Sequence, residues 1–275
     1  MNEVSKESNI DDIMIREAIR IVEEANKQKI LLRILGAVAV AIHTQDQGHI
    51  HDRLQRLDDK KQRFTDIDFI AYSKQRYEIR KLFEDDLGYT VDITMLTLHG
   101  KSRLIYYHPE QLFHVDIFFD KLEFSHDIIF CTKSRESRLS LDSPTITLAD
   151  IILGKIQIHE INEKDIKDII VLLRGHRIRN EDQREIINAK YIAQLLADDW
   201  GFWYDATTNL NKVKKSSTEY VSSGLLTLEE SEDVSRKVDK IVSHIDQEEK
   251  SKNWAKRAEK GTRKVWWNPV EEISR

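Results

Sequence analysis

Apolar residues recur every three to four positions along some segments of the chain and at every second position along others. The first pattern predicts amphipathic helices, and the second predicts strands with one buried face. In the first half of the chain, helices are predicted at 10–29, 38–43 and 73–86, and strands at 30–35, 63–72, 90–98, 102–107 and 113–120. In the second half, helices are predicted from 147, at 165–174, 183–200 and 203–215, and from 227.

This order of elements predicts an α+β fold, in which a small mixed β-sheet flanked by helices is followed by an all-helical half. We place the boundary after residue 143, so that 1–143 form the α/β core with its N-terminal helix and 144–275 form a helical domain. The third and fourth predicted strands are expected to pair as a hairpin. Gly201 is expected just beyond the end of a helix, and Thr227 with Glu230 is typical of a capping box that begins one.

The predicted strand at 63–72 carries two aspartates, Asp66 and Asp68, at a spacing of two. Alternate side chains of a strand point to opposite faces, so both carboxylates share one face while Ile67 and Phe69 share the other. Neighbouring carboxylates repel each other and are costly to desolvate unless a cation lies between them. Two interpretations follow from this pattern alone: a polar edge strand that faces water, or a site for a hard divalent cation such as Mg²⁺.

A junction of small residues, Gly36-Ala37, connects the predicted strand at 30–35 to the short helix at 38–43. Small residues allow a ligand to approach the backbone closely, and the first N–H groups of a helix can bind an anion. The alternative is a tight turn in which small residues are needed only for packing.

The composition describes a soluble globular protein of 275 residues, with 40% hydrophobic and 33% charged residues. The formal net charge of −5 gives no general signature of nucleic-acid binding, although a local basic patch remains compatible with it. The single cysteine, Cys131, excludes an intramolecular disulfide and suits a reducing compartment. Because the first residues lack the apolar core of a signal peptide and no apolar run reaches transmembrane length, we expect a cytoplasmic protein without a membrane partner.

The polar segment 44–62 and the residue before it contain several candidate metal ligands, His43, His49, His51 and Asp52. One interpretation is a zinc site, although the spacing matches no closed tetrahedral pattern and no cysteine lies nearby. The interpretation we prefer is a mobile loop beside a site, since functional loops are commonly long and polar.

The segment 250–264 is rich in lysine and arginine and is followed by Trp266-Trp267. Cations next to aromatic residues can bind nucleic acid. The preferred alternative is a solvated chain end whose tryptophans pack onto the domain.

The Gly36-Ala37 junction, the segment from Arg63 to Asp68, an aspartate on the strand at 113–120 and the later Lys155 with Lys164-Asp165-Ile166-Lys167-Asp168 form a combined pattern. This pattern resembles the nucleotidyltransferase superfamily with the polymerase-beta-like fold. The nearest resemblance is to the minimal and abortive-infection-type nucleotidyltransferases of prokaryotic toxin–antitoxin systems. It covers roughly residues 30–175, and Ala37 stands where the family usually has glycine or serine.

The resemblance implies a metal-dependent enzyme that moves a nucleoside monophosphate from a nucleoside triphosphate, ATP among them, to an acceptor hydroxyl. It implies that Asp66, Asp68 and Asp116 are catalytic and hold two ions of Mg²⁺ or Mn²⁺. The residues that it implies in nucleotide binding are Gly36, Ala37, Arg63, Thr65, Lys155 and Asp165. The acceptor is expected to be a tRNA, a protein or a small molecule, and an antitoxin is an expected partner.

Several assignments keep alternatives. Asp92 and Asp120 rival Asp116 as the third carboxylate, and Lys155 is alternatively a surface lysine. Asp165 either orients Lys155 or contacts the acceptor; with Asp168 it is alternatively an ordinary helix-face partner of neighbouring lysines. We expect His51 and His114 to be satisfied or solvated histidines. The alternative function is a catalytically degenerate module that binds nucleotide or a protein partner without turnover.

Overall fold

The computed structural model describes residues 9–57, 62–130 and 137–269; Cys131 lies outside them. The chain forms two compact units. The first unit consists of Met1–Ile42, Leu57–Asp120 and Ser143–Thr145, and the second of His43–Arg56, Lys121–Asp142 and Ile146–Arg275. The short segment before residue 146 belongs to the first unit because the Ile34 N–H donates a hydrogen bond of 3.0 Å to the Pro144 carbonyl.

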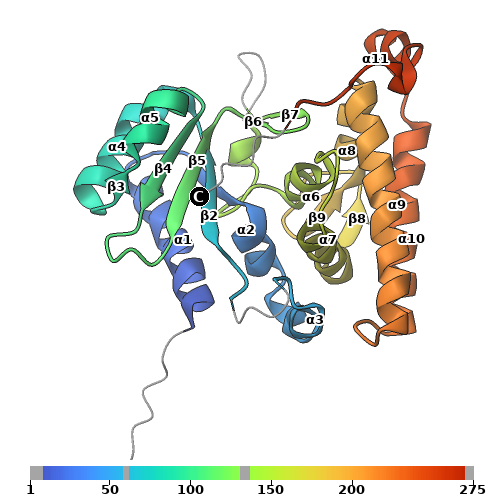
Figure 1. Ribbon diagram of the computed structural model, residues 1–275, viewed down its shortest axis with the longest axis horizontal. Helices are drawn as coiled ribbons and strands as arrows, with labels where there is room; N and C mark the ends of the chain where they lie inside the picture. The colour runs from blue at the N-terminus through green and yellow to red at the C-terminus, as the bar shows by residue number, and fades with distance from the viewer. Residues whose placement is uncertain (1–8, 58–61, 131–136, 270–275) are drawn as a thin grey trace, which may run out of the picture. The chain divides into compact units, whose positions relative to one another are not determined.

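A mixed sheet forms the centre of the first unit, and within the described residues it has five strands. The strands are β1 (Leu32–Leu35), β2 (Asp66–Ala71), β3 (Thr90–Val91), β4 (Arg103–Tyr107) and β5 (His114–Phe119). Their order across the sheet is β1-β2-β5-β4-β3, with β2 and β5 parallel and the other pairs antiparallel (Figure 1). The two strands that carry aspartates therefore lie side by side.

The first unit also contains helices, one of which packs on the sheet through aromatic side chains. They are α1 (Ile10–Lys27), α2 (Gly36–His43), α4 (Arg76–Lys81), which continues as a π-helical segment (Leu82–Asp86), and α5 (Ile93–His99). Phe83 of the π-helical segment packs with ring centroids 6.3 Å from Phe69 on β2 and 4.9 Å from Tyr106 on β4. The face of the sheet with Phe69 and Tyr106 is thus buried in the apolar core, which leaves the opposite face for the aspartates.

One strand prediction is wrong: most of 90–98 is helical. After the two residues of β3, the chain enters α5, and the Asp92 side chain accepts a hydrogen bond of 2.9 Å from the Met95 N–H. An aspartate in this position caps the start of a helix, and this local interaction outweighs the strand-like alternation of apolar residues. The predicted hairpin is therefore only the short pairing of β3 with β4.

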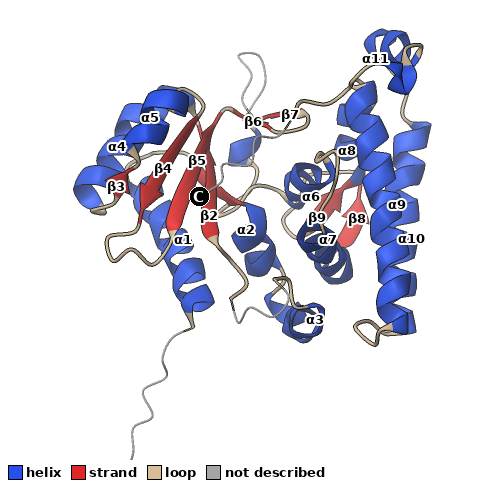
Figure 2. Cartoon of the chain, viewed as in Figure 1, coloured by secondary structure: helices blue, strands red, loops and turns tan. Residues whose placement is uncertain are grey.

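The second unit is mainly helical (Figure 2). Its helices are α3 (Gly48–Leu54), α6 (Leu148–Ile156), α7 (Glu163–Gly175), α8 (Ala189–Leu196), α9 (Trp200–Ser222), α10 (Leu228–Gln247) and α11 (Lys252–Ala258). Its strands are the antiparallel pair β6 (Lys121–Glu123) and β7 (Asp127–Ile129) and the parallel pair β8 (Arg177–Arg179) and β9 (Ile186–Asn188). The α+β fold class is confirmed; the pair β8–β9 is an addition to the helical half.

Two predictions about helix ends have different outcomes. The capping box at Thr227 and Glu230 is confirmed, with both reciprocal hydrogen bonds present. Gly201 does not end a helix but lies one residue inside the start of α9, which Asp199 caps. A Cβ at Gly201 would lie 2.6 Å from the Trp266 carbonyl oxygen, so close approach of the C-terminal segment accounts for this glycine.

The two polar regions differ in how well their predictions hold. The segment 44–62 contains a short 3₁₀ turn (Gln45–Gln47) and α3, so the loop prediction is wrong for its described part; 58–61 lie outside the described residues. Near the C-terminus, the Trp266 indole N–H donates to Asp205 at 3.0 Å, and Trp267 stacks on His159 at 3.7 Å. The interpretation of tryptophans packed onto the domain is thereby supported.

Candidate metal centre

The register of β2 and β5 brings four polar side chains together on one face of the sheet. In this parallel pair, Asp66 lies opposite His114 and Asp68 lies opposite Asp116. Residues that oppose each other in neighbouring strands point to the same face, and so do residues two apart in one strand. We call these four residues, together with Arg103 of β4, the sheet cluster.

Three of these side chains could hold one metal ion. One ligand atom each of Asp66, His114 and Asp116 lies within 4.8 Å of the others, and this is the group of that kind among the described residues. The solvent exposure of these side chains decreases from Asp66, which is 34% exposed, through His114 at 19%, to Asp116 at 1%. An ion could therefore enter from the Asp66 side and reach a carboxylate that the protein holds rigidly.

An unsatisfied ring nitrogen supports this fit. The His114 Nε2 atom is buried and has no hydrogen-bond partner within the described part of the chain, although it lies 3.3 Å from Asp66 Oδ2. A buried polar atom without a hydrogen bond is uncommon and calls for a reason such as an absent ion. The residues present thus fit a divalent cation.

Asp116, rather than either of its rivals, joins the sheet cluster. It receives a hydrogen bond from the Arg103 guanidinium. Asp92 caps α5 and accepts a hydrogen bond of 2.9 Å from the Tyr107 hydroxyl. Asp120 lies just beyond β5 with φ of 62° and accepts a hydrogen bond of 3.0 Å from the Ser73 N–H. Both rivals thus have local structural roles.

The Gly36-Ala37 junction lies next to Asp68, the carboxylate of this face that is not among the three potential ligands. Gly36 has φ of 69°, and a Cβ at this position would lie 2.3 Å from Asp68 Oδ2. Two physical reasons therefore require glycine, the left-handed backbone and the approach of the carboxylate. Because α2 begins at Gly36, its first N–H groups lie at the same end of β1 that faces Asp68.

Arg63 and Thr65 lie on the approach to β2. The Arg63 N–H donates to both carboxylate oxygens of Asp11, at 2.9 and 3.0 Å, and the Thr65 hydroxyl donates to Asp66 Oδ1 at 3.0 Å. Burial raises the pKa of Asp11 despite these backbone hydrogen bonds. Asp11 thereby ties the segment before β2 to α1, and Thr65 orients a residue of the sheet cluster.

The other two predicted site residues, Lys155 and Asp165, lie in the second unit. The Lys155 ammonium donates to Asp165 Oδ1 at 2.8 Å and to Asp168 Oδ2 at 2.7 Å. The Arg56 Nε–H donates to both oxygens of Asp168, at 3.0 and 2.9 Å. We call these four residues the helix cluster. The interpretation of Lys155 as a surface lysine is wrong, since it is buried; Asp165 orients it, and Asp168 pairs with it.

The charges of the helix cluster stabilise one another. Burial alone would raise the pKa of Asp168, but the Lys155 ammonium and the Arg56 guanidinium hold it below its ordinary value. Burial alone would lower the pKa of Lys155, but the carboxylates of Asp165 and Asp168 outweigh burial and raise it. Both groups are therefore charged in the folded protein near neutral pH.

The prediction that His114 is satisfied or solvated is wrong for its Nε2 atom, which is buried and lacks a hydrogen bond within the described residues, and sequence patterns do not identify Arg103 or Arg56. His114 precedes Asp116 by two positions, the same spacing that places Asp66 beside Asp68, so the alternation of the strand offered a signal for it. Arg103 lies on β4 and pairs with Asp116 on the neighbouring strand, and Arg56 pairs with Asp168 across 112 positions. No local pattern identifies such distant partners.

The segment with four candidate zinc ligands does not form a metal site in the described residues. The His51 Nε2 lies 2.7 Å from the Thr44 hydroxyl, and the His43 Nδ1 lies 3.0 Å from the Glu185 carboxylate. His49 is exposed and lies 4.0 Å from Glu230. His51 and His43 are thus satisfied by separate partners, and His49 is exposed to solvent.

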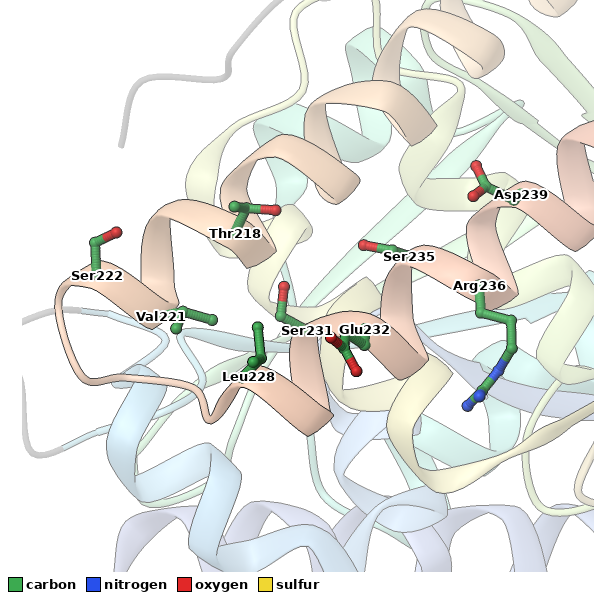
Figure 3. Close-up of a pocket in the computed structure, with 9 residues that line it drawn as sticks. All are labelled: Thr218, Val221, Ser222, Leu228, Ser231, Glu232, Ser235, Arg236 and Asp239. Atoms are coloured by element: carbon green, nitrogen blue, oxygen red, sulfur yellow. The ribbon is translucent and has the colours of Figure 1, made fainter.

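A groove of about 530 Å³ lies between α9 and α10 in the second unit (Figure 3). The side chains that line it are Thr218, Val221, Ser222, Leu228, Ser231, Glu232, Ser235, Arg236 and Asp239. Two of these side chains are apolar, four carry a hydroxyl group and three are charged, and none belongs to either cluster. The chemistry predicted from the sequence therefore does not depend on this groove.

Neither a scan against protein-family models nor searches of curated proteins and of solved structures find a match for this chain. Within the described residues, every helix is too short or too polar to cross a membrane. The functional argument therefore depends on the geometry of the sheet cluster.

Proposed function

We propose that this protein is a metal-dependent nucleotidyltransferase, which transfers a nucleoside monophosphate from a nucleoside triphosphate to an acceptor hydroxyl. The observation that carries the proposal is the register of β2 and β5, which sets Asp66 beside His114 and Asp68 beside Asp116 on one face. Carboxylates from separate strands that meet at one point are the ligands that such a reaction needs, because nucleotidyl transfer depends on positioning and on neutralisation of charge.

Asp66, Asp68 and Asp116 are the residues that would hold Mg²⁺ or Mn²⁺. Bound there, the ions would neutralise the phosphates and lower the pKa of the acceptor hydroxyl. Arg103 holds the Asp116 carboxylate in place, and the Thr65 hydroxyl does the same for Asp66. These contacts fix the ligand positions before substrate arrives, which reduces the cost of ordering them during the reaction.

The start of α2 is the element best suited to the triphosphate. Gly36 and Ala37 are half-buried, and the first N–H groups of a helix attract anions. Compared with the serine that the resembled family often has at the position of Ala37, alanine lacks a hydroxyl but keeps the backbone N–H donor. Lys155 is held by two carboxylates in the second unit, so its contact with the triphosphate, like the contacts of Arg63 and Asp165, stays a prediction.

The acceptor and the partners follow only from the resemblance, which favours a tRNA or a protein as acceptor and an antitoxin as partner. A transfer assay tests the reaction and the acceptor together. The full chain is incubated with each nucleoside triphosphate labelled on the α-phosphate, with Mg²⁺ or Mn²⁺ and with total RNA, total protein or small-molecule alcohols. We expect label to reach one of these pools.

Asp66→Asn should lower this transfer by about 10³-fold or more, because it removes a charged metal ligand. The matched control is Asp85→Asn, which makes the same chemical change at an exposed position of the first unit. Equal transfer by the Asp66→Asn variant and the wild type would overturn the proposal.

A second candidate function is nucleotide binding without turnover. The observation that favours it is the pairing of the nearly inaccessible Asp116 with Arg103, which competes with a metal ion for the carboxylate. Metal-dependent binding of a labelled nucleoside triphosphate, with no transfer to any pool, would support this candidate over the enzyme.

A further inference from the structure

We infer that His114 is a nitrogen ligand of the cation held by Asp66 and Asp116, and that it makes this position select a divalent transition-metal ion over Mg²⁺. The inference deepens the proposed function and rests on its metal site. It concerns the one member of the sheet cluster that offers a ring nitrogen as a ligand.

The position of the imidazole is the first argument. His114 begins β5, lies opposite Asp66 and shares its face with Asp116 two residues later. A ligand atom of each of the three residues lies within 4.8 Å of the others. Because the strands on both sides hold the backbone, small rotations of the side chains suffice to bring three donors onto one ion.

The state of the ring nitrogen is the second argument. The His114 Nε2 is buried and makes no hydrogen bond within the described residues. Its contact with Asp66 Oδ2, at 3.3 Å, has the distance of an ion pair but lacks the geometry of a hydrogen bond. A cation bound to this nitrogen and to the two carboxylates would satisfy all three groups.

The chemistry of the donor set gives the selectivity. Mg²⁺ prefers oxygen ligands in near-octahedral geometry, whereas imidazole nitrogen favours first-row transition ions. A site of two carboxylates and one imidazole therefore binds Mn²⁺ more tightly than a site of oxygens alone does, while Mg²⁺ gains little from the nitrogen. Replacement of His114 by glutamine keeps a polar side chain of similar reach and offers oxygen in place of the ring nitrogen.

The test uses Mn²⁺ and Mg²⁺ as probes on the full chain without nucleotide. Mn²⁺ binding is measured by titration calorimetry, and electron spin-echo envelope modulation of bound Mn²⁺ detects a directly coordinated ¹⁴N nucleus. We expect a ¹⁴N signal that is lost in His114→Gln, with Mn²⁺ affinity lowered by about tenfold or more and Mg²⁺ affinity changed by less than about threefold. His99→Gln, at an exposed position of α5, is the matched control and should behave as the wild type.

The outcomes separate this inference from the proposed function. Mn²⁺ that binds in an Asp66-dependent manner without a ¹⁴N signal overturns the role of His114 and leaves the carboxylate site intact. Equal losses of Mn²⁺ and Mg²⁺ affinity in His114→Gln overturn the selectivity. Binding of neither ion, or binding unaffected by Asp66→Asn, overturns the metal site and with it both proposals.

Discussion

The helix cluster and the sheet cluster differ in how the charge of their carboxylates is neutralised. In the helix cluster, Asp168 is 2% exposed and receives hydrogen bonds from both Lys155 and Arg56, so permanent cations of the protein neutralise it. In the sheet cluster, Arg103 pairs with the buried Asp116, but the partly exposed Asp66 lies beside an imidazole whose Nε2 lacks a hydrogen bond within the described residues. Buried charge that is matched within the fold supports structure, whereas ligand atoms that converge next to solvent are suited to an exchangeable cation.

The largest expected difference is in stability, and it arises in the helix cluster. Lys155→Met keeps the length of the side chain but leaves Asp168 and Asp165 without their shared ammonium. Removal of one partner from a buried ion pair costs about 3–5 kcal/mol of unfolding free energy. Urea denaturation of the wild type and the variant measures this cost.

The double variant Lys155→Met/Asp168→Asn is the control for this comparison. The double variant removes the Asp168 carboxylate that lacks its lysine partner in Lys155→Met, so it should be more stable than Lys155→Met alone. A Lys155→Met variant within about 0.5 kcal/mol of the wild type would mean that the helix cluster has no structural role.

The next largest effect concerns the glycine beside the sheet cluster. Gly36→Ala places a Cβ 2.3 Å from Asp68 Oδ2 in a left-handed backbone, and we expect a loss of about 2–4 kcal/mol together with weaker Mn²⁺ binding. Gly224→Ala is the matched control, since Gly224 has φ of 76° but a Cβ there would meet no atom of the described residues within 4 Å. It should cost only about 1–2 kcal/mol. Equal costs would show that the approach of Asp68 is irrelevant.

A smaller stability effect is expected for the sheet cluster itself. Asp66→Asn should change the unfolding free energy by no more than about 0.5 kcal/mol, because Asp66 is partly exposed and its removal relieves repulsion between carboxylates. The same variant should nonetheless weaken Mn²⁺ binding strongly in a calorimetric titration. A loss of several kcal/mol would place Asp66 in the same structural class as Asp168 and remove the contrast between the clusters.

The sequence predicts the polar face of each of the two strands that carry the sheet cluster, but it does not predict that these strands pair. Strand alternation predicts that Asp66 and Asp68 share a face, and it predicts the polar face of the strand that contains Asp116. The parallel pairing of these strands joins residues 48 positions apart, as in Asp68 and Asp116, and no local pattern encodes this register. Helices and the strands β3 and β4 lie between them along the chain, and the packing of the whole unit decides which strands become neighbours.

Local chemistry explains the errors in the elements. Around Asp92 the apolar alternation favours a strand, but a carboxylate that caps the next N–H groups favours a helix, and the cap prevails. At Gly201 a glycine typical of a helix end occurs inside a helix because the C-terminal segment passes close by. In both places a single residue has two common uses, and only the tertiary neighbours decide between them.

The smallest effect is expected from pH between about 5 and 9, and it tests whether the helix cluster is permanently charged. The pKa of Asp168 is lower in the folded protein than its ordinary value of 3.8, so its stabilising contribution is complete above that value and is lost as the pH falls through the folded pKa. The pKa of Lys155 is higher than its ordinary value of 10.5, so its contribution is complete below that value and is lost as the pH rises through the folded pKa. The difference in unfolding free energy between wild type and Asp168→Asn should therefore be constant across this range and shrink only as the pH falls below the ordinary value of 3.8. Denaturation at several pH values measures it, and a difference that changes between about pH 5 and 9 would show that the cluster exchanges protons near neutrality, as an active site does and a structural ion pair does not.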